Sequence, residues 1–205
     1  MKIISPKINY LEEKTFTECL DNEFNNGLIT KNEDNIIIEN MTIDTFKFQN
    51  IDFKKIVFSH ISLIDVIFED CDLSNISFDD EYLTRVSFIN CKMTGVSFIN
   101  TKLENITIEK SLLKYANFSY TNIYNLEIKN TDMEEARFMN IKIKNLLLNN
   151  NNLSKMEIIE TNMDKIDLST CNLTNIKFDF KSLKGVIIDP SDAIYLVSNL
   201  GVVIK

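Results

Sequence analysis

The chain has 205 residues, of which 44% are hydrophobic and 25% charged, and its formal net charge is −8. This length suits one domain, and the content of only four glycines and two prolines argues against a linker-rich or disordered protein. The acidic balance disfavours direct binding of nucleic acid, which needs Lys and Arg to neutralise phosphates, and no apolar run approaches the roughly 18 residues of a membrane span.

Residues 1–35 do not follow the pattern of the rest of the chain. Phe16, Leu20 and Phe24 are spaced for one face of a helix, and Gly27 is placed to end it. We expect this region to be an N-terminal cap segment. Because the N-terminus lacks the apolar run of a signal peptide, we also expect a cytoplasmic protein.

From Ile38 to Ile188 every fifth residue is apolar, without a break in register. A second, looser apolar series lies two residues earlier and includes Val66 and Val86. A helix would scatter such a series around its circumference, since five residues advance about 500°. A flat strand would send alternate pairs to opposite faces. A chain that turns a corner after every fifth residue can bury both apolar series, so residues 36–189 are predicted to form a solenoid.

The length of one coil follows from a longer period in the residue types of this series. Steps of twenty from Phe58 reach Phe78, Phe98, Phe118 and Phe138, whereas steps of fifteen reach a mixture of Phe and Leu. Four faces of five residues therefore make one coil, and we expect about 7–8 coils in the repeat region. Asn suits the corners because it tolerates left-handed turns. The corner asparagines are Asn50, Asn90, Asn100, Asn130, Asn140 and Asn150.

Three segments carry a family resemblance: Cys71-Asp72-Leu73-Ser74-Asn75, Ala116-Asn117-Phe118 and Cys171-Asn172-Leu173-Thr174-Asn175. They resemble the pentapeptide-repeat family, whose consensus reads roughly Ala-Asp/Asn-Leu-x-x. The resemblance implies an all-β fold, a right-handed quadrilateral β-helix. The first repeat position here is often Ile, Val or Leu instead of Ala, so we expect a fuller interior.

Residues 190–205 are predicted to form a C-terminal helix and strand. Pro190 ends the repeat, Ser191 or Asp192 can cap a helix, and Gly201 is placed to end it before a short strand, Val202 to Ile204. The segment is similar to the C-terminal module of bacterial Qnr-type pentapeptide-repeat proteins, which implies a homodimer. The residues expected in the dimer contact are Ile194, Val197, Leu200, Val202, Val203 and Ile204.

The sequence offers no catalytic, cofactor-binding or metal-binding constellation. The four glycines are isolated, and the only histidine, His60, falls at an outward corner. Cys71 and Cys91 are expected to stack on adjacent coils as buried thiols in preference to a disulfide. We therefore do not expect an enzyme.

An acidic band is the main local charge signal, because no Lys or Arg lies between Lys55 and Arg85. Glu81 occupies an inward position, where an unpaired carboxylate is costly. We expect it to pair with Arg85 or to make the face bulge outward. The band consists of Asp65, Glu69, Asp70, Asp72, Asp79, Asp80 and Glu81.

Two functional hypotheses remain open. The Qnr resemblance implies a DNA mimic that binds DNA gyrase or topoisomerase IV and protects it from quinolones, with the acidic band as the partner-binding surface. The competing hypothesis is a structural or interaction protein with an unassigned protein partner, which could contact outward apolar residues or tyrosines. These are Ile89, Ile99, Met139, Ile159, Tyr115, Tyr120 and Tyr124. One side of the rod is expected to be net basic, with Arg85, Lys102, Lys142, Lys144, Lys165, Lys181 and Lys184.

Overall fold

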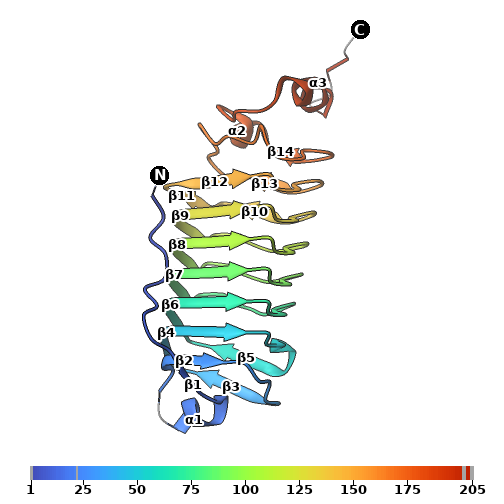
Figure 1. Cartoon of the computed structure of the whole chain (residues 1–205). Coiled ribbons are helices and arrows are strands. Elements are labelled where there is room, and N and C mark those ends of the chain that lie inside the picture. Colours follow the sequence, from blue (N-terminus) through green and yellow to red (C-terminus); the bar gives the residue numbers. More distant parts are fainter. Residues whose placement is uncertain (1, 22, 200–201, 204–205) are drawn as a thin grey trace.

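The computed structural model of the chain describes residues 2–21, 23–199 and 202–203. It is a rod of parallel coils, about 8 turns long, with short helices near both ends (Figure 1). The elements are β1 (Glu12–Glu13), α1 (Phe16–Asp21), β2 (Asn25–Ile29), β3 (Ile36–Glu39), β4 (Thr42–Gln49), the 3-10 helix η1 (Phe53–Lys55), β5 (Ile56–Ser59), β6 (Ser62–Glu69), β7 (Tyr82–Ile89), β8 (Lys102–Glu109), β9 (Asn122–Lys129), β10 (Arg137–Met139), β11 (Lys142–Ile143), β12 (Leu146–Asn149), β13 (Glu157–Ile159), β14 (Lys177–Phe178), α2 (Phe180–Leu183) and α3 (Pro190–Asn199).

Apart from the two pairings of β2, which is offset by 15 residues from β1 and by 19 from β4, the strands pair in a constant register of twenty residues. Ser62 of β6 lies beside Tyr82 of β7, and Tyr82 lies beside Lys102 of β8, all in parallel. The main sheet has nine strands in the order β1-β2-β4-β6-β7-β8-β9-β11, with β12 also paired to β9. The predicted coil of four five-residue faces is therefore confirmed.

We number the faces by the inward residue at their centre. The first face is centred on residues 63, 83, 103 and 123, and the second on 68, 88, 108 and 128. Each eight-residue strand from β6 to β9 covers both faces and bends at a corner residue with positive φ, such as Asp65 (φ 55°) or Asn105 (φ 56°). The third and fourth faces are tighter turns joined by single bridges, such as Asp72 to Lys92 and Ser77 to Ser97.

Stacked phenylalanines fill the interior. On the fourth face, the ring centroids of Phe78 and Phe98 are 5.4 Å apart and those of Phe98 and Phe118 are 5.0 Å apart. A second column on the second face stacks Phe68 on Phe88 at 5.1 Å. The four cysteines are free and buried, so the prediction of buried thiols at Cys71 and Cys91 is confirmed.

The corners adopt left-handed backbone conformations, as the asparagine pattern predicts. Asn90 has φ 53° and Asn100 has φ 56°. His60, Tyr115 and Tyr120 adopt the same conformation with φ between 52° and 61°, although such side chains rarely do so. Stacking against neighbouring coils therefore overrides local preference at these corners. His60 is exposed at its corner, as predicted.

The N-terminal region differs from a simple cap. Helix α1 ends at Asp21, so Phe24 lies beyond it, and Gly27 lies within β2 instead of ending the helix. Residues 2–11 run along the side of the stack from near β9 down to β1 (Figure 1). The Lys7 N–H donates to Asp65 Oδ1 at 2.8 Å and the Ile4 N–H donates to Asn105 Oδ1 at 3.3 Å. We call residues 2–11 the N-terminal strap; the expectation that all of 1–35 caps the end of the rod is wrong for this strap.

At the other end, α3 begins at Pro190, so the predicted caps Ser191 and Asp192 lie inside the helix, and α3 lies beyond the last coil (Figure 1). Val202 and Val203 are not in a strand, so the predicted terminal strand is wrong at these two residues. Leu200, Gly201 and Ile204 lie outside the described residues. Within the described ranges, no helix is long and apolar enough to cross a membrane.

We predict that Phe98→Ala lowers the free energy of unfolding by about 3–5 kcal/mol, because it leaves a cavity between two stacked rings. Phe180→Ala is the matched control; the Phe180 side chain is 83% exposed, and its loss should change stability by less than about 0.5 kcal/mol. Chemical denaturation of both variants measures the difference. Equal stabilities of the two variants would contradict the stacked core.

Candidate interaction surface

Asp65 of the predicted acidic band is a buried structural residue. Its side chain receives two bonds from Arg85, Nε to Oδ1 at 2.6 Å and Nη2 to Oδ2 at 2.7 Å, besides the Lys7 N–H of the strap. Only 6% of Asp65 is exposed. The hydrogen bonds from Arg85 hold the pKa of Asp65 below its usual value, against the opposing effect of burial. Asp65 therefore joins the strap to the rod and is not free to contact a partner.

Two further carboxylates of the band form ion pairs between coils. Glu69 pairs with Lys47, and Asp72 lies 3.1 Å from the Lys54 ammonium and 3.2 Å from that of Lys92. Partial burial alone would raise the pKa of Asp72, but hydrogen bonds from Ser74 and from these two lysines lower it to about 2. These carboxylates are charged and already paired with cations of the same chain.

The corner and turn carboxylates of the band accept hydrogen bonds from the next coil. Asp70 accepts from the Asn90 amide and Asp80 from the Asn100 amide, both at 2.6 Å. Asp79 accepts from the Ser97 hydroxyl and the Ile99 N–H. Asp70 and Asp80 remain charged groups at the surface. The side chains of the band are nevertheless engaged in contacts between coils, so the band is not an open acidic face.

Glu81 does not pair with Arg85, and that part of the prediction is wrong. Arg85 turns instead to Asp65, which occupies the same corner one coil earlier. Glu81 is 9% exposed and accepts bonds from the backbone N–H groups of Ile61 and His60. Burial raises the pKa of Glu81, and these two backbone bonds only partly oppose it.

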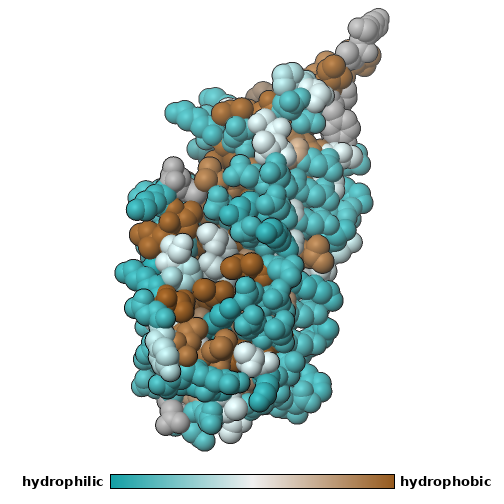
Figure 2. Space-filling model, in the orientation of Figure 1, coloured by the Kyte–Doolittle hydropathy of each residue, from teal (hydrophilic) through white to brown (hydrophobic). Residues whose placement is uncertain are grey.

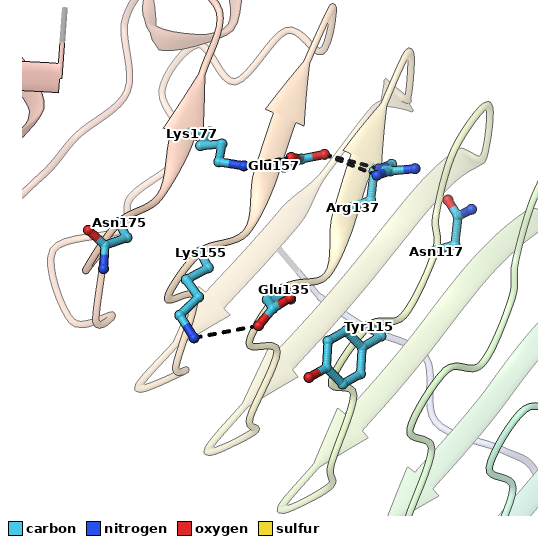
Figure 3. Close-up of a pocket in the computed structure, with 8 residues that line it drawn as sticks. All are labelled: Tyr115, Asn117, Glu135, Arg137, Lys155, Glu157, Asn175 and Lys177. Carbon is cyan, nitrogen blue, oxygen red and sulfur yellow. Dashed lines mark hydrogen bonds and ion pairs between the residues drawn. The ribbon is translucent and has the colours of Figure 1, made fainter.

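A shallow groove of about 530 Å³ lies along the corner between the third and fourth faces (Figure 3). Its charges alternate along the rod: Glu157 lies between Arg137 at 3.1 Å and Lys177 at 2.9 Å. Lys155 is 3.5 Å from Glu135 and 2.8 Å from Glu134. Tyr115 and Asn117 form one end of the groove, next to Glu135 and Arg137 of the following coil (Figure 3). The groove therefore has neutralised walls and one aromatic end.

The tyrosines are the most accessible of the outward residues singled out in the sequence. Tyr115, Tyr120 and Tyr124 are 56%, 52% and 40% exposed. The outward apolar residues Ile89, Ile99, Met139 and Ile159 are only half-buried by their neighbours. On the face shown in Figure 2, hydrophobic residues form separate patches within a mostly hydrophilic surface. Such scattered patches are ordinary for a folded protein, so exposed tyrosines are the better contact candidates.

The described residues expected at the C-terminal contact are exposed. Ile194 and Val197 of α3 are 63% and 39% exposed, and Val202 and Val203 are 52% and 80% exposed. Leu200 and Ile204 lie outside the described residues. Among the described side chains, no group of three His, Cys, Asp or Glu residues is arranged to hold a metal ion.

Comparison with known proteins identifies the class. The model of the pentapeptide repeat region matches residues 41–118 and 81–158, which together cover more than half of the chain. The chain therefore belongs to the pentapeptide-repeat proteins. The class agrees with the twenty-residue register and the left-handed corners described above. No curated protein matches the chain in sequence.

Solved structures of this class resemble the chain only distantly. Full-length QnrB1, a plasmid-mediated fluoroquinolone resistance protein, is 20% identical, with 87% of this chain and 89% of that chain covered and a TM-score of 0.45. A pentapeptide repeat protein from the Arabidopsis thaliana thylakoid lumen is 23% identical over 44% of this chain and 63% of that chain, with a TM-score of 0.42. HetL from Nostoc sp. strain PCC 7120, involved in heterocyst differentiation regulation, is 14% identical over 78% of this chain and 92% of that chain, with a TM-score of 0.26. Likeness at this level carries no argument about the partner.

We predict that Glu81→Gln raises the free energy of unfolding at neutral pH. The pKa of Glu81 is raised in the folded chain, so its ionised form opposes folding above that pKa, and the opposition disappears as the pH falls through it. The stability gained by Glu81→Gln should therefore become smaller as the pH falls from 7 to about 4, near the ordinary pKa of glutamate. Chemical denaturation at both pH values measures it, with Glu39→Gln, an exposed residue of β3, as the control. A loss of stability at pH 7 would show that the carboxylate is well satisfied in its site.

Proposed function

We propose that this pentapeptide-repeat protein is a non-catalytic interaction scaffold of the cytoplasm, a rigid rod that presents columns of side chains to a protein partner. The observation that supports it best is the constant twenty-residue register, which stacks outward residues of successive coils about 4.8 Å apart. A rigid surface with little conformational freedom loses little entropy on binding. The exposed tyrosines provide the large, amphipathic contact groups that protein interfaces favour.

We propose a type II topoisomerase, DNA gyrase or topoisomerase IV, as the partner to be tested first. The net charge of −8 and the rod shape support this choice, because an acidic rod can occupy a basic DNA-binding surface. The internal pairing of Asp65, Glu69 and Asp72 favours the alternative, a scaffold with another protein partner, because these carboxylates are engaged within the rod. Asp70 and Asp80 are the carboxylates of the band best placed for mimicry of phosphates.

We predict that the purified chain inhibits DNA gyrase supercoiling, or rescues it from a quinolone, in proportion to its concentration. The variant Asp70→Asn with Asp80→Asn should lose most of this effect, because it removes two corner charges. Asn occupies the same corner columns at Asn90 and Asn100, so the fold should tolerate it. The control Glu135→Asn with Glu160→Asn removes two corner charges elsewhere. If the unmodified chain has no effect well above micromolar concentration, the topoisomerase proposal is wrong and partners are sought by pull-down.

We further propose a homodimer through the C-terminal segment. Val197 and Ile194 of α3 and the two valines that follow expose apolar surface at one end of the rod. Apolar surface gathered in one place is typical of protein contacts. Contact at the ends would leave the four faces of each rod open to a partner.

We predict that light scattering at micromolar concentration gives the mass of a dimer. Val197→Asp should give a monomer, because a charge would be buried without a partner in the contact. Val57→Asp on β5, where Val57 is 56% exposed on the side of the rod, is the matched control and should stay dimeric. A monomeric unmodified chain would overturn the proposed dimer.

A further inference from the structure

The lysines of the first face differ from those of the other three faces. Elsewhere along the described coils most lysines, though not Lys165, are matched with carboxylates, as Lys114 is with Glu134 at 2.7 Å and Lys129 with Glu109 at 3.1 Å. On the first face, the ammonium of Lys102 reaches only Glu104, at 3.5 Å. Lys142 and Lys144, both exposed, form no ion pair with any described carboxylate. The outward positions from 102 to 144 thus hold three lysines and one glutamate, a net charge of +2 on a chain of −8.

Tyr124 holds two of these lysines over its ring. The Nζ atoms of Lys102 and Lys144 lie 5.8 Å and 6.0 Å from the ring centroid. Both distances are within the range of a cation–π contact. Two ammonium groups gathered at one ring repel each other, so an anion placed beside them would be bound more strongly than at an isolated lysine. Tyr124 is itself 40% exposed and remains accessible.

A hollow of about 380 Å³ adjoins this cluster at the corner between the fourth and first faces. Tyr82, which is 59% exposed, and Tyr124 line it together with Lys102 and Asn122. The hollow also contains two acids, Asp80 and Glu81. Asp80 accepts a bond from Asn100, and Glu81 is turned to the backbone N–H groups of Ile61 and His60. The two acids thus lie at one end of the hollow, on the coil that precedes Lys102, and Asn122 and Tyr124 lie on the coil that follows it.

We propose that this lysine–tyrosine face (Tyr82, Lys102, Asn122, Tyr124, Lys142 and Lys144) binds an acidic peptide segment of a partner protein, an inference that rests on the proposed scaffold function. Carboxylates of the segment lie against Lys102, Lys142 and Lys144, and an aromatic or apolar residue of the segment packs between the two tyrosines. Charge complementarity selects an acidic occupant. Nucleic acid carries the same sign of charge as an acidic peptide, but its affinity depends on the number of phosphates neutralised, and this face offers only three lysines.

The test is fluorescence anisotropy of a labelled, glutamate-rich decapeptide that contains one tyrosine, titrated with the full chain at low salt. The variant Lys102→Gln/Lys142→Gln/Lys144→Gln should bind about tenfold more weakly, the loss expected for a few exposed charge contacts. The matched control Lys31→Gln/Lys92→Gln/Lys110→Gln has the same net charge and changes lysines away from the first face, so its affinity should stay within about twofold of the unmodified chain. Circular dichroism checks that both variants keep the fold.

Substitution of Tyr124 provides a second, independent test of the proposal. Tyr124→Leu should weaken binding several-fold because the two lysines lose the ring that gathers them, whereas Tyr124→Phe keeps the ring and should keep the affinity. No binding by the unmodified chain, or equal loss in the two triple-lysine variants, would overturn the proposal. Tighter binding of a single-stranded oligonucleotide of equal length would overturn it as well. The peptide titration is independent of the supercoiling assay, so failure of one proposal is distinguishable from failure of the other.

Discussion

The twenty-residue register is the constraint on which the rest of the structure depends. From β4 onward each coil forms its backbone hydrogen bonds with its neighbouring coils, so a residue faces the residue twenty positions away. Inward residues must then fit against copies of their own position, which phenylalanine does by stacking. Polar corners form ladders in the same way: the Asn125 amide donates to Asn105 at 3.0 Å, and that of Asn145 donates to Asn125 at 2.7 Å.

The same register governs the charges of the outer surface. Like charges twenty residues apart would lie about 4.8 Å from one another at the backbone, so most columns alternate in sign or place a polar residue between charges. Arg137, Glu157 and Lys177 form such a column, and hydrogen bonds from Lys177 hold the pKa of Glu157 below its usual value. Asp52 and Asp72 are adjacent acids in one column, and Lys54 lies near both. Carboxylates that look like a free acidic band in the linear sequence are therefore engaged by the next coil. The lysines around Tyr124 are an exception, and exceptions to a stability rule are where binding is expected.

Much of the fold could be predicted from the sequence because its strongest physical signal, an apolar residue at every fifth position, is also what the coil requires. The individual side-chain pairs were harder to predict from the sequence. Arg85 was expected to reach Glu81 because the two are close in sequence, yet it binds Asp65 on the same corner one coil earlier. A step of twenty from Arg85 would have found this partner. The N-terminal strap left no such signal, because its contacts to Asp65 and Asn105 use backbone N–H groups, which every residue except proline supplies.

These observations also explain why the fold says so little about function. Most of the residues that a sequence pattern can identify lie in the core, at the corners or in pairs between coils. These residues stabilise the rod. Function must then reside in outward positions that the register leaves free. Tyr82 and Tyr124 are of this kind. Ser62 and Lys102 flank Tyr82, Glu104 precedes Tyr124 in its column, and the Lys144 ammonium lies over the Tyr124 ring, but the coil requires no aromatic side chain at either position. A position that could hold a small polar residue but holds an exposed aromatic ring beside an excess of lysines is best explained by contact with something outside the chain.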